Sequence, residues 1–446
     1  MIGSLLFGLF FGAGNLIFPI HMGQLAGPFT STAIVGFLIT AIGLPFLGVV
    51  AMAITNSSSL FDLSSRVHPA YAYFMTIALY LTIGPFFATP RLGTTSYEVG
   101  FAQHIPAQYQ TVGLAVFTLL FFGTALLFSL KPTKILFYIG KFLNPLFLVL
   151  LSLLIITAFL KPMGGVTTAN ADASYTTNTS FINGFLEGYN TMDALASLAF
   201  GVIVIQTIKD LGVTKPAAIA RDTIKSGFIS VVLMGIIYTC LAYLGTMSTG
   251  QLPVTENGGI ALSQISFYYF GGFGSFLLAL IVTIACLKTA IGLITAGAET
   301  FHQLFPRSLS YKTYVILFSG LSCLIANAGL TKIITFSLPV LMLLYPLAIT
   351  LIITAILSPL FKNRQVVYVT VTLFTVIISL ADFLKALPPF ISTQRWAEEI
   401  LSLFRQYIPF FDSGLGWIVP GAMGLATGWI ISLLTRPKNK KQYLSS

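Results

Sequence analysis

The amino-acid sequence predicts an all-α polytopic membrane protein with about twelve transmembrane helices. Of its 446 residues, 56% are hydrophobic and 8% are charged, whereas about 25% of the residues of a soluble domain are charged. Apolar segments recur along the chain at about the 20-residue length that a bilayer requires. The first and the sixth segments are interrupted at mid-depth by glycine and polar residues, a pattern typical of transporters.

Short polar connections separate the predicted spans, and we expect no separate soluble domain. The connection 388–414 holds an amphipathic stretch, 394–407, that suits a helix on the membrane surface. The first span has only about ten residues before its interruption, which suggests that the true start lies upstream of Met1. The predicted spans are 2–26, 31–54, 70–97, 111–130, 134–160, 183–208, 224–247, 271–297, 313–329, 332–358, 366–387 and 415–434.

The distribution of basic residues predicts that both termini are cytoplasmic. With this orientation the cytoplasmic connections hold sixteen lysines and arginines and the opposite side holds six. The basic residues behind the net charge of +10 therefore lie in alternate loops and do not form one patch. This distribution argues against a nucleic-acid partner and for a lipid bilayer. The cytoplasmic set includes Arg66, Lys131, Lys134, Arg221, Lys225 and the C-terminal basic tail, and the opposite set includes Lys161, Lys332, Lys385, Arg395 and Arg405.

The first interruption is the run Gly12-Ala13-Gly14-Asn15, followed by Pro19. Glycine costs about 1 kcal/mol relative to alanine in a helix, and Asn15 carries polar groups into hydrocarbon. Because both costs fall at one depth, we expect the backbone to leave the helix there and to turn its peptide groups toward a ligand. The alternative is that the glycines only allow close helix packing.

A break at this point offers binding groups for both an anion and a cation. The amides of Ala13 and Gly14 lie at a half-helix N-terminus, which carries about half a positive charge and suits a carboxylate. The carbonyls from about Gly8 to Phe11, with the Asn15 side-chain oxygen, are available to coordinate a cation.

The sixth span contains a second interruption, from Glu187 to Asp193. Five spans separate the two breaks, so the chain is expected to be a 5+5 inverted repeat with broken helices 1 and 6 and two extra C-terminal helices. The alternative is a coincidence of two polar helices. The predicted units are a first half 1–160, an external loop 161–182, a second half 183–358, and the last two spans with a cytoplasmic basic tail, 359–446.

Two further spans carry ionisable residues whose insertion is costly. Asp193 costs about 2.5–3.5 kcal/mol, and by default such a carboxylate marks function: it holds a substrate ammonium, a coupling cation or a proton, or else forms a structural ion pair. Lys288 lies beside Thr289 in the eighth span, where it must pair, deprotonate or snorkel, and it is a candidate for coupling together with Asp193.

Three charged residues are predicted to lie near the outer side of the carrier. Arg91 and Glu98 are two turns apart on one helix face, so we expect them to form an external gate or pair. Glu187 precedes Asp193 by one and a half turns and is a candidate for the gate or rim, with contact to the substrate as the alternative.

Enzymatic chemistry finds no support in the sequence. The four histidines lack a paired metal-binding spacing, and the three cysteines lie in apolar segments. We find neither a nucleophile motif nor a phosphate loop, and no repeated filter sequence that indicates a channel. No cofactor or catalytic residue is therefore expected.

The chain resembles the branched-chain amino acid:cation symporters, the BrnQ-like carriers, over essentially its whole length. The resemblance rests on several motifs in order: Gly12-Ala13-Gly14-Asn15 with Ile17-Phe18-Pro19, the run from Gly36 to Pro45, Gly84-Pro85 through Arg91, Ser96-Tyr97-Glu98, and Glu187-Gly188-Tyr189 with Thr191-Met192-Asp193. This family is similar in design to the broken-helix transporters of the LeuT kind. The resemblance implies import of leucine, isoleucine or valine across the plasma membrane, the bacterial inner membrane, by a sodium or proton gradient.

The resemblance also implies roles for individual residues. Ala13 and Gly14 would bind the substrate carboxylate. Gly8, Phe11 and Thr289 would form one sodium site, and Asn15 with Thr191 a second. The apolar pocket would come from spans three, six and eight, with Phe86, Phe87 and Leu293 as its candidates.

Lys288 departs from the hydroxyl pair that related broken-helix carriers present at this position. A protonated lysine there could substitute for sodium, so proton coupling stays open beside sodium coupling. Another small neutral amino acid on the same scaffold is the alternative substrate, and an intramembrane enzyme or a sensory receptor is the alternative class. The oligomeric state is not predicted, because a face of small residues fits lipid and a dimer contact equally.

Overall fold

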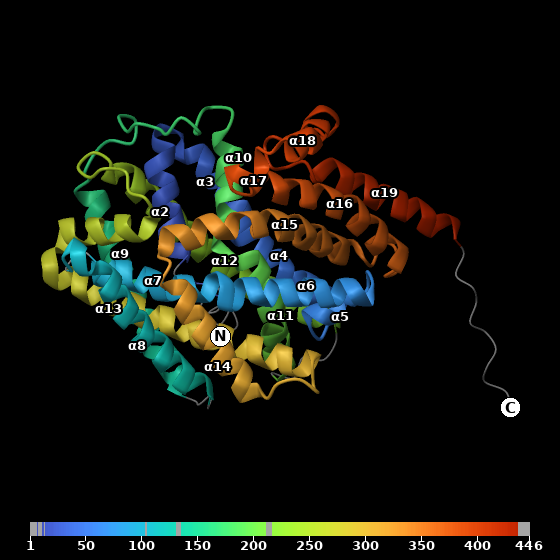
Figure 1. The fold of residues 1–446 in the computed structure, drawn as a ribbon, viewed down its shortest axis with the longest axis horizontal. Helices are drawn as coiled ribbons and strands as arrows, with labels where there is room; N and C mark the ends of the chain where they lie inside the picture. The colour runs from blue at the N-terminus through green and yellow to red at the C-terminus, as the bar shows by residue number, and fades with distance from the viewer. Residues whose placement is uncertain are drawn as a thin grey trace.

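The computed structural model describes residues 7, 11–12, 14–102, 105–130, 135–210 and 216–435. Within these residues all regular structure is helical (Figure 1). In the described part of the chain, seven helical stretches are long and apolar enough to cross a membrane, and three shorter apolar helices accompany them. The predicted fold class, an all-α polytopic membrane protein, is confirmed.

Within the described residues, each predicted span contains helical structure, and the first of them is described as helix from Gly14 onward. The first five correspond to α2 (Gly14–Ala26); α3 (Thr30–Leu38), η2 (Ile39–Gly43) and α4 (Leu44–Thr55); α6 (Pro69–Leu81), η3 (Thr82–Phe86) and α7 (Ala88–Gly100); α8 (Gln110–Leu130); and α9 (Ile135–Leu160). The next five correspond to α10 (Ser180–Glu187), η6 (Gly188–Thr191) and α11 (Asp193–Asp210); α12 (Pro216–Ser248); α13 (Gly258–Leu304); α14 (Tyr311–Ala326); and α15 (Leu330–Leu357). The last two are α16 (Gln365–Ala386) and α19 (Ile418–Leu434), and short helices η1 (Gly27–Phe29), α5 (Leu60–Ser65), η5 (Ala107–Tyr109) and α17 (Pro389–Ser392) lie between spans.

The second and third spans contain π-helical turns, η2 and η3, and the third span is kinked at η3. Gly84 leaves helical geometry inside η3, at φ −85° and ψ −122°, next to Pro85, which has no amide hydrogen to donate. The Thr89 hydroxyl donates to the Ile83 carbonyl at 3.1 Å and closes the bend. Such π-turns frequently lie at functional sites, and η3 contributes to the cavity described below.

The eighth span is longer than predicted. The sequence placed it at 271–297, whereas α13 extends from Gly258 to Leu304 with a break at Gly271, where φ is +62°. The Asn257 side chain caps the N-terminus by accepting hydrogen bonds from the amides of Gly259 (2.9 Å) and Ile260 (3.1 Å). Residues 258–270 thus form a helical arm ahead of the span, which the hydropathy pattern did not separate from the preceding loop.

Small residues bring the helices around the two breaks into backbone contact. A Cβ atom on Gly23 of α2 would lie 1.9 Å from the Ala242 carbonyl oxygen of α12, and one on Gly245 would lie 2.0 Å from the Ile20 carbonyl oxygen. A Cβ on Gly184 of α10 would lie 1.9 Å from a carbonyl of α3. Membrane helices associate through such close approaches, which hold α2 and α10 in the centre of the molecule.

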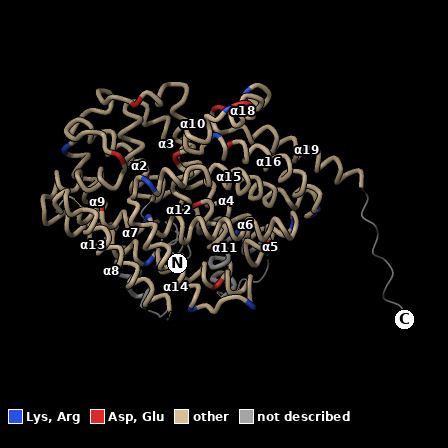
Figure 2. Tube along the Cα trace, viewed as in Figure 1, with Lys and Arg blue, Asp and Glu red and all other residues tan. Residues whose placement is uncertain are grey.

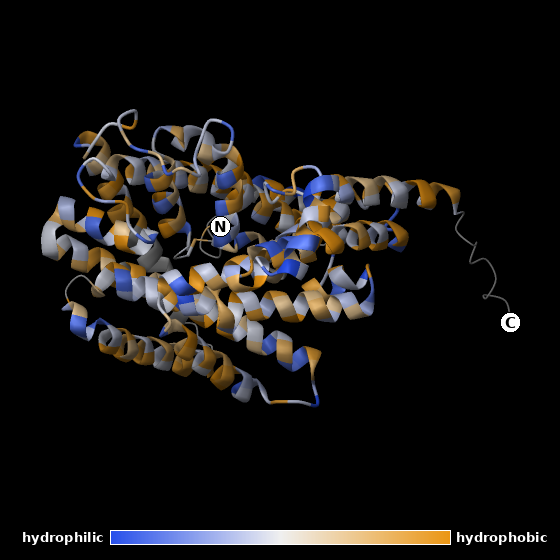
Figure 3. Cartoon of the chain, turned by 45° about the horizontal axis from the view of Figure 1, so that its top comes forward, coloured by the Kyte–Doolittle hydropathy of each residue, from blue (hydrophilic) through white to orange (hydrophobic). Residues whose placement is uncertain are grey.

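The outer surface is that of a protein solvated by lipid. Leu119 and Leu120 on α8 are 67% and 66% exposed, and exposed apolar side chains continue along α9, α12 and α19. Figure 3 shows hydrophobic residues recurring along the helices, and Figure 2 shows few charged residues along them. A soluble protein rarely exposes apolar surface on this scale.

The two long connections differ in structure. The connection 161–182 contacts α2, where the Asp172 amide donates to the Leu25 carbonyl at 2.8 Å. The connection 388–414 contains α18 (Arg395–Tyr407), a helix on the predicted amphipathic stretch. Lys131, Lys134 and the basic tail from Arg436 onward lie outside the described residues.

Candidate functional site

The second predicted break is confirmed. Helix α10 ends at Glu187, a single 3₁₀ turn η6 follows, and Met192 adopts a left-handed conformation (φ 61°, ψ 10°) before α11 begins at Asp193. A non-glycine residue in this conformation is uncommon, and it reverses the direction in which the peptide groups point. Asp193 therefore lies at a helix N-terminus, where its negative charge complements the helix dipole.

The first break lies before Gly14, where α2 begins. Phe11 and Gly12 are not helical, and the Phe11 amide donates to the Phe7 carbonyl at 2.8 Å. The Asn15 side chain folds back so that its Oδ1 accepts a hydrogen bond from the Gly12 amide at 2.8 Å. Gly8 and Ala13, predicted to bind the cation and the carboxylate, lie outside the described residues.

Asn15 joins the two breaks. Its Nδ2 donates to Asp193 Oδ2 at 2.5 Å and also to the Tyr238 hydroxyl of α12. Asn15 is 2% exposed and Asp193 5% exposed, so this network is sheltered from solvent. A carboxylate that accepts a hydrogen bond from a buried amide is held in one orientation, and the two discontinuous helices are held in register.

A cavity lies between the breaks and is lined from four spans. One part of its wall is polar, with Asn15, Arg91, Thr191, Asp193 and Thr289. The rest is apolar or backbone. It consists of Gly12, Gly14, Ile83, Ala88, Leu92, Met192, Ala196, Phe200 and Leu293.

Arg91 lies in the wall of this cavity and is 3% exposed. Its guanidinium donates to the Asn190 carbonyl, which the break in helix six removes from helical bonding, and lies 3.7 Å from the Met192 sulfur. Its central carbon is 5.0 Å from the centroid of the Phe18 ring. Arg91 therefore connects α7 to both broken helices.

The sequence grouped Arg91 with Glu98 in an outer gate or pair, and the structure separates them. Seven helical residues span about 10 Å along an axis. Glu98 lines a different cavity, which it shares with Gln264 and Lys332. Glu187, the other predicted gate residue, accepts a hydrogen bond from Asn190 Nδ2 at 3.1 Å and so braces η6. The polar run around Arg91, almost wholly buried in α7, was the sequence signal for its central position.

Other predicted site residues divide between the cavity and its surroundings. Thr289 and Leu293 line the cavity, whereas Lys288, Phe86 and Phe87 are not in its wall. Phe86 is 37% exposed. The reason is the bend at η3, which turns Ile83 and Ala88 toward the cavity in place of the phenylalanines.

Thr191 and Thr289 use their hydroxyl hydrogens within their own segments. Thr191 Oγ1 donates to the Gly188 carbonyl at 2.9 Å, and Thr289 Oγ1 donates to the Ala285 carbonyl at 3.2 Å. The hydroxyl oxygens of both residues keep acceptor capacity. They are therefore able to ligate a cation or accept a hydrogen bond from a ligand.

These features define a polytopic membrane protein with two broken helices, and comparison with solved structures supports this fold. The inward-facing conformation of Mhp1 matches with a TM-score of 0.59 and 13% identity, covering 97% of this chain and 91% of Mhp1. The closed conformation of Mhp1, a nucleobase-cation-symport-1 family transporter with bromovinylhydantoin bound, matches with a TM-score of 0.62, 10% identity and the same coverage. At these identities the likeness is one of fold.

The family follows from the sequence comparison. A family model described as branched-chain amino acid transport protein matches residues 1–435, and the chain belongs to this family. The branched-chain amino acid permease BrnQ of Lactobacillus delbrueckii subsp. lactis is 49% identical over 94% of this chain and 93% of its own length. BrnQ of Bacillus subtilis is 43% identical over 97% of this chain and 96% of its own length. The protein is a multi-pass membrane transporter and not an enzyme.

Proposed function

We propose that the chain imports leucine, isoleucine and valine by alternating access, driven by a sodium or proton gradient. The single observation that carries this proposal is a cavity between two broken helices that combines a charged wall with an apolar wall, in a chain 49% identical to a branched-chain amino acid permease. In this proposal the units 1–160 and 183–358 are the inverted repeats, and both termini face the cytoplasm of a bacterial cell.

The cavity wall matches the parts of a branched-chain amino acid. The substrate carboxylate would bind at the N-terminus of α2, at Gly14, where amides and the helix dipole favour an anion. The ammonium would bind near Asp193, with Thr191 and Asn15 beside it. The aliphatic side chain would contact Ile83, Leu92, Ala196, Phe200 and Leu293, all of which line the cavity.

The coupling ion has two candidates. For sodium, Thr289 of α13 and the backbone near Gly12 line the same part of the cavity, which supports a site formed by Phe11, Gly8 and Thr289. A second site at Asn15 and Thr191 is the weaker proposal, because Asn15 Oδ1 already accepts the Gly12 amide. For protons, the candidates are Asp193, which lines the cavity, and Lys288, which precedes the cavity residue Thr289.

Counterflow in proteoliposomes tests the substrate. We expect labelled leucine to accumulate against unlabelled leucine and to be displaced by isoleucine and valine. Displacement by alanine or serine alone would replace the proposal with the alternative of another small neutral amino acid. In a separate assay of net uptake, without unlabelled leucine inside, accumulation that survives collapse of all ion gradients by ionophores would refute secondary active transport.

Imposed gradients test the coupling ion. Leucine uptake is measured with an inward sodium gradient at equal pH and with an inward proton gradient without sodium, for wild type, Lys288→Ala and the exposed control Lys312→Ala. Uptake driven by sodium in both variants assigns coupling to sodium and removes Lys288 from it. Uptake driven by protons and lost only in Lys288→Ala assigns coupling to the lysine.

A further inference from the structure

A buried carboxylate lies outside the cavity, in the C-terminal helix α16. Asp382 is 2% exposed, and neither of its carboxylate oxygens has a hydrogen-bond partner among the described residues. By contrast, Asp193 accepts a bond from Asn15. An ionised carboxylate without hydrogen bonds or a counter-ion is very costly in an apolar environment, and such a group takes up a proton instead.

Two buried donors from segments packed around α16 are also unpaired within the described part of the chain. They are the Tyr189 hydroxyl of η6 and the Trp417 indole nitrogen at the start of α19. The Trp417 indole N–H is directed to the Tyr189 hydroxyl without the geometry of a full hydrogen bond, and Asp382 acts on that hydroxyl electrostatically. The Trp417 segment packs on α16, since a Cβ on Gly416 would lie 3.3 Å from Ile378, one turn before Asp382. An acceptor and two donors therefore lie in one region of the molecule, and none of the three has a complete hydrogen bond among the described residues.

Tyr189 connects this cluster to the broken helix. Its ring stacks on Tyr345 of α15 at a centroid distance of 4.0 Å and an interplanar angle of 15°. Helices α15, α16 and α19 lie side by side (Figure 1), so the cluster is enclosed between them and η6. Tyr189 precedes Thr191 and Asp193 in the cavity wall by two and four residues.

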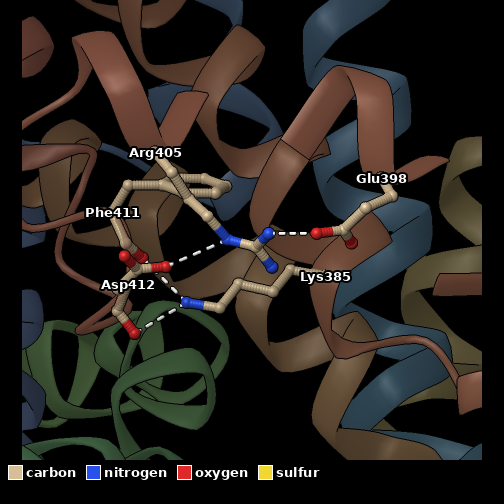
Figure 4. A network of polar contacts seen from close by, with 5 residues as sticks. All are labelled: Lys385, Glu398, Arg405, Phe411 and Asp412. Atoms are coloured by element: carbon tan, nitrogen blue, oxygen red, sulfur yellow. Dashed lines mark hydrogen bonds and ion pairs between the residues drawn. The ribbon is translucent and has the colours of Figure 1, made fainter. Parts of the chain in front are cut away.

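The nearest cation is already held by other groups. Lys385, one turn along α16, donates to the carbonyl oxygens of Phe411 (2.9 Å) and Asp412 (2.7 Å). Arg405 of α18 pairs with Asp412 at 3.2 Å and with Glu398 (Figure 4). These contacts hold the lysine toward the 411–412 turn, so it does not bond to the buried carboxylate.

The other elements packed against α16 add few ionisable groups. Helix α19 contains none, and α15 contributes Tyr345, with Lys332 at its far end. The charged residues of α18 are Arg395, Glu398, Glu399 and Arg405, on the surface of the molecule. The groups that face the carboxylate are therefore Lys385, Tyr189, Tyr345 and Trp417.

We propose that Asp382 is a proton-binding site of the carrier, separate from the substrate cavity. The proton on Asp382 controls the hydrogen bonds by which α16 and the start of α19 hold the broken helix six. In the arrangement described here the carboxyl group is neutral. When it releases its proton to water, the carboxylate that remains accepts hydrogen bonds from Trp417 Nε1 and the Tyr189 hydroxyl. A metal cation fits less well, because the indole nitrogen only donates and supplies no ligand.

The consequence for transport rests on the proposed function. Tyr189 belongs to the segment that must move when the cavity changes its exposure, so a charge-assisted hydrogen bond to it in the ionised state slows the change. One such bond slows exchange by about tenfold, at about 1.4 kcal/mol per factor of ten. Exchange is therefore fast at acid pH and slow at alkaline pH.

Infrared titration tests the site without transport. The carboxylic-acid carbonyl band of purified protein is followed from acid to alkaline buffer in wild type, Asp382→Asn and the surface control Asp412→Asn. We expect a pH-dependent component that is absent only in Asp382→Asn. In Trp417→Phe, which keeps the packing and removes the donor, this component should persist to higher pH. Identical spectra for wild type and Asp382→Asn, or a component that does not titrate, would overturn the proposal.

Leucine exchange at equal pH on both sides of the membrane tests the consequence. Wild type should slow by about tenfold toward alkaline pH, while Asp382→Asn and Trp417→Phe stay fast. A wild-type pH profile in both variants would refute control by this proton. If no variant exchanges leucine at any pH, the proposed substrate fails, and the infrared titration still decides whether Asp382 binds a proton.

Discussion

Removing the Asn15 side chain should separate the two breaks. Asn15→Ala deletes the bonds to the Gly12 amide, to Asp193 and to Tyr238, all in a buried network. A hydrogen bond to a charged group contributes about 1.5–3 kcal/mol, and neutral ones between membrane helices about 0.6 kcal/mol each. The sum is about 3 kcal/mol, or about a 100-fold change in an equilibrium constant.

That free energy divides between stability and substrate affinity. Without the network, the conformation that holds both breaks in register competes with other conformations. The apparent Kd for leucine then rises as the fraction of molecules in the binding-competent conformation falls. We expect leucine binding to purified protein to weaken by up to about 100-fold, with any remainder seen as a lower Tm. Scintillation proximity binding and thermal unfolding measure the two parts.

Two further variants separate geometry from charge. Asn15→Asp keeps the shape of the side chain and the acceptor for the Gly12 amide, but it places a second carboxyl group beside Asp193. The affinity of this variant for leucine should fall below that of Asn15→Ala and recover at acid pH. Asn183→Ala makes the same deletion at a surface site of α10, where Nδ2 donates to the Ser174 carbonyl at 2.6 Å, and should stay within about twofold of wild type. Unchanged binding and Tm in Asn15→Ala would refute the cross-link.

Three other substitutions test the packing and the cavity. Gly188→Ala would place a Cβ 1.9 Å from Thr40 Oγ1 and should abolish folded protein in size-exclusion chromatography, whereas Gly235→Ala, with nothing within 4 Å, should behave as wild type. Arg91→Lys cannot keep both the Asn190 contact and the stacking on an aromatic ring, so uptake should fall by at least about tenfold with protein levels unchanged. Phe200→Ala enlarges the apolar wall and should improve competition by methionine relative to valine by about tenfold; an unchanged ratio would remove Phe200 from the side-chain pocket.

Much of the architecture could be predicted because membrane insertion imposes strong rules on sequence. The cost of glycine and asparagine in a lipid-facing helix marked the break before Gly14, and the polar cluster from Glu187 to Asp193 marked the other. Apolar length placed the spans well, except that α13 begins at Gly258, because an N-terminal cap at Asn257 is a local signal that hydropathy does not detect.

The residues that sequence reasoning misplaced depend on contacts between distant segments. Helical periodicity put Arg91 and Glu98 on one face of α7, but only the bend at Gly84 and the break at Met192 show that the arginine reaches the centre. Asp382 was not singled out, although it is an acid within an apolar span. The significance of Asp382 depends on its neighbours Trp417 and Tyr189, and both of these are distant from it in sequence.

The pattern of satisfied and unsatisfied groups at the breaks supports the proposed binding site for the substrate carboxylate. Unwinding a helix in a membrane leaves peptide groups that need partners, and here side chains supply several: Asn15 for the Gly12 amide, Arg91 for the Asn190 carbonyl, and Thr191 for the Gly188 carbonyl. Among the described residues, the Arg91 Nε atom remains buried without a partner. Because Arg91 lines the same cavity as Gly14, a substrate carboxylate at the N-terminus of α2 would satisfy this donor as well as the helix dipole.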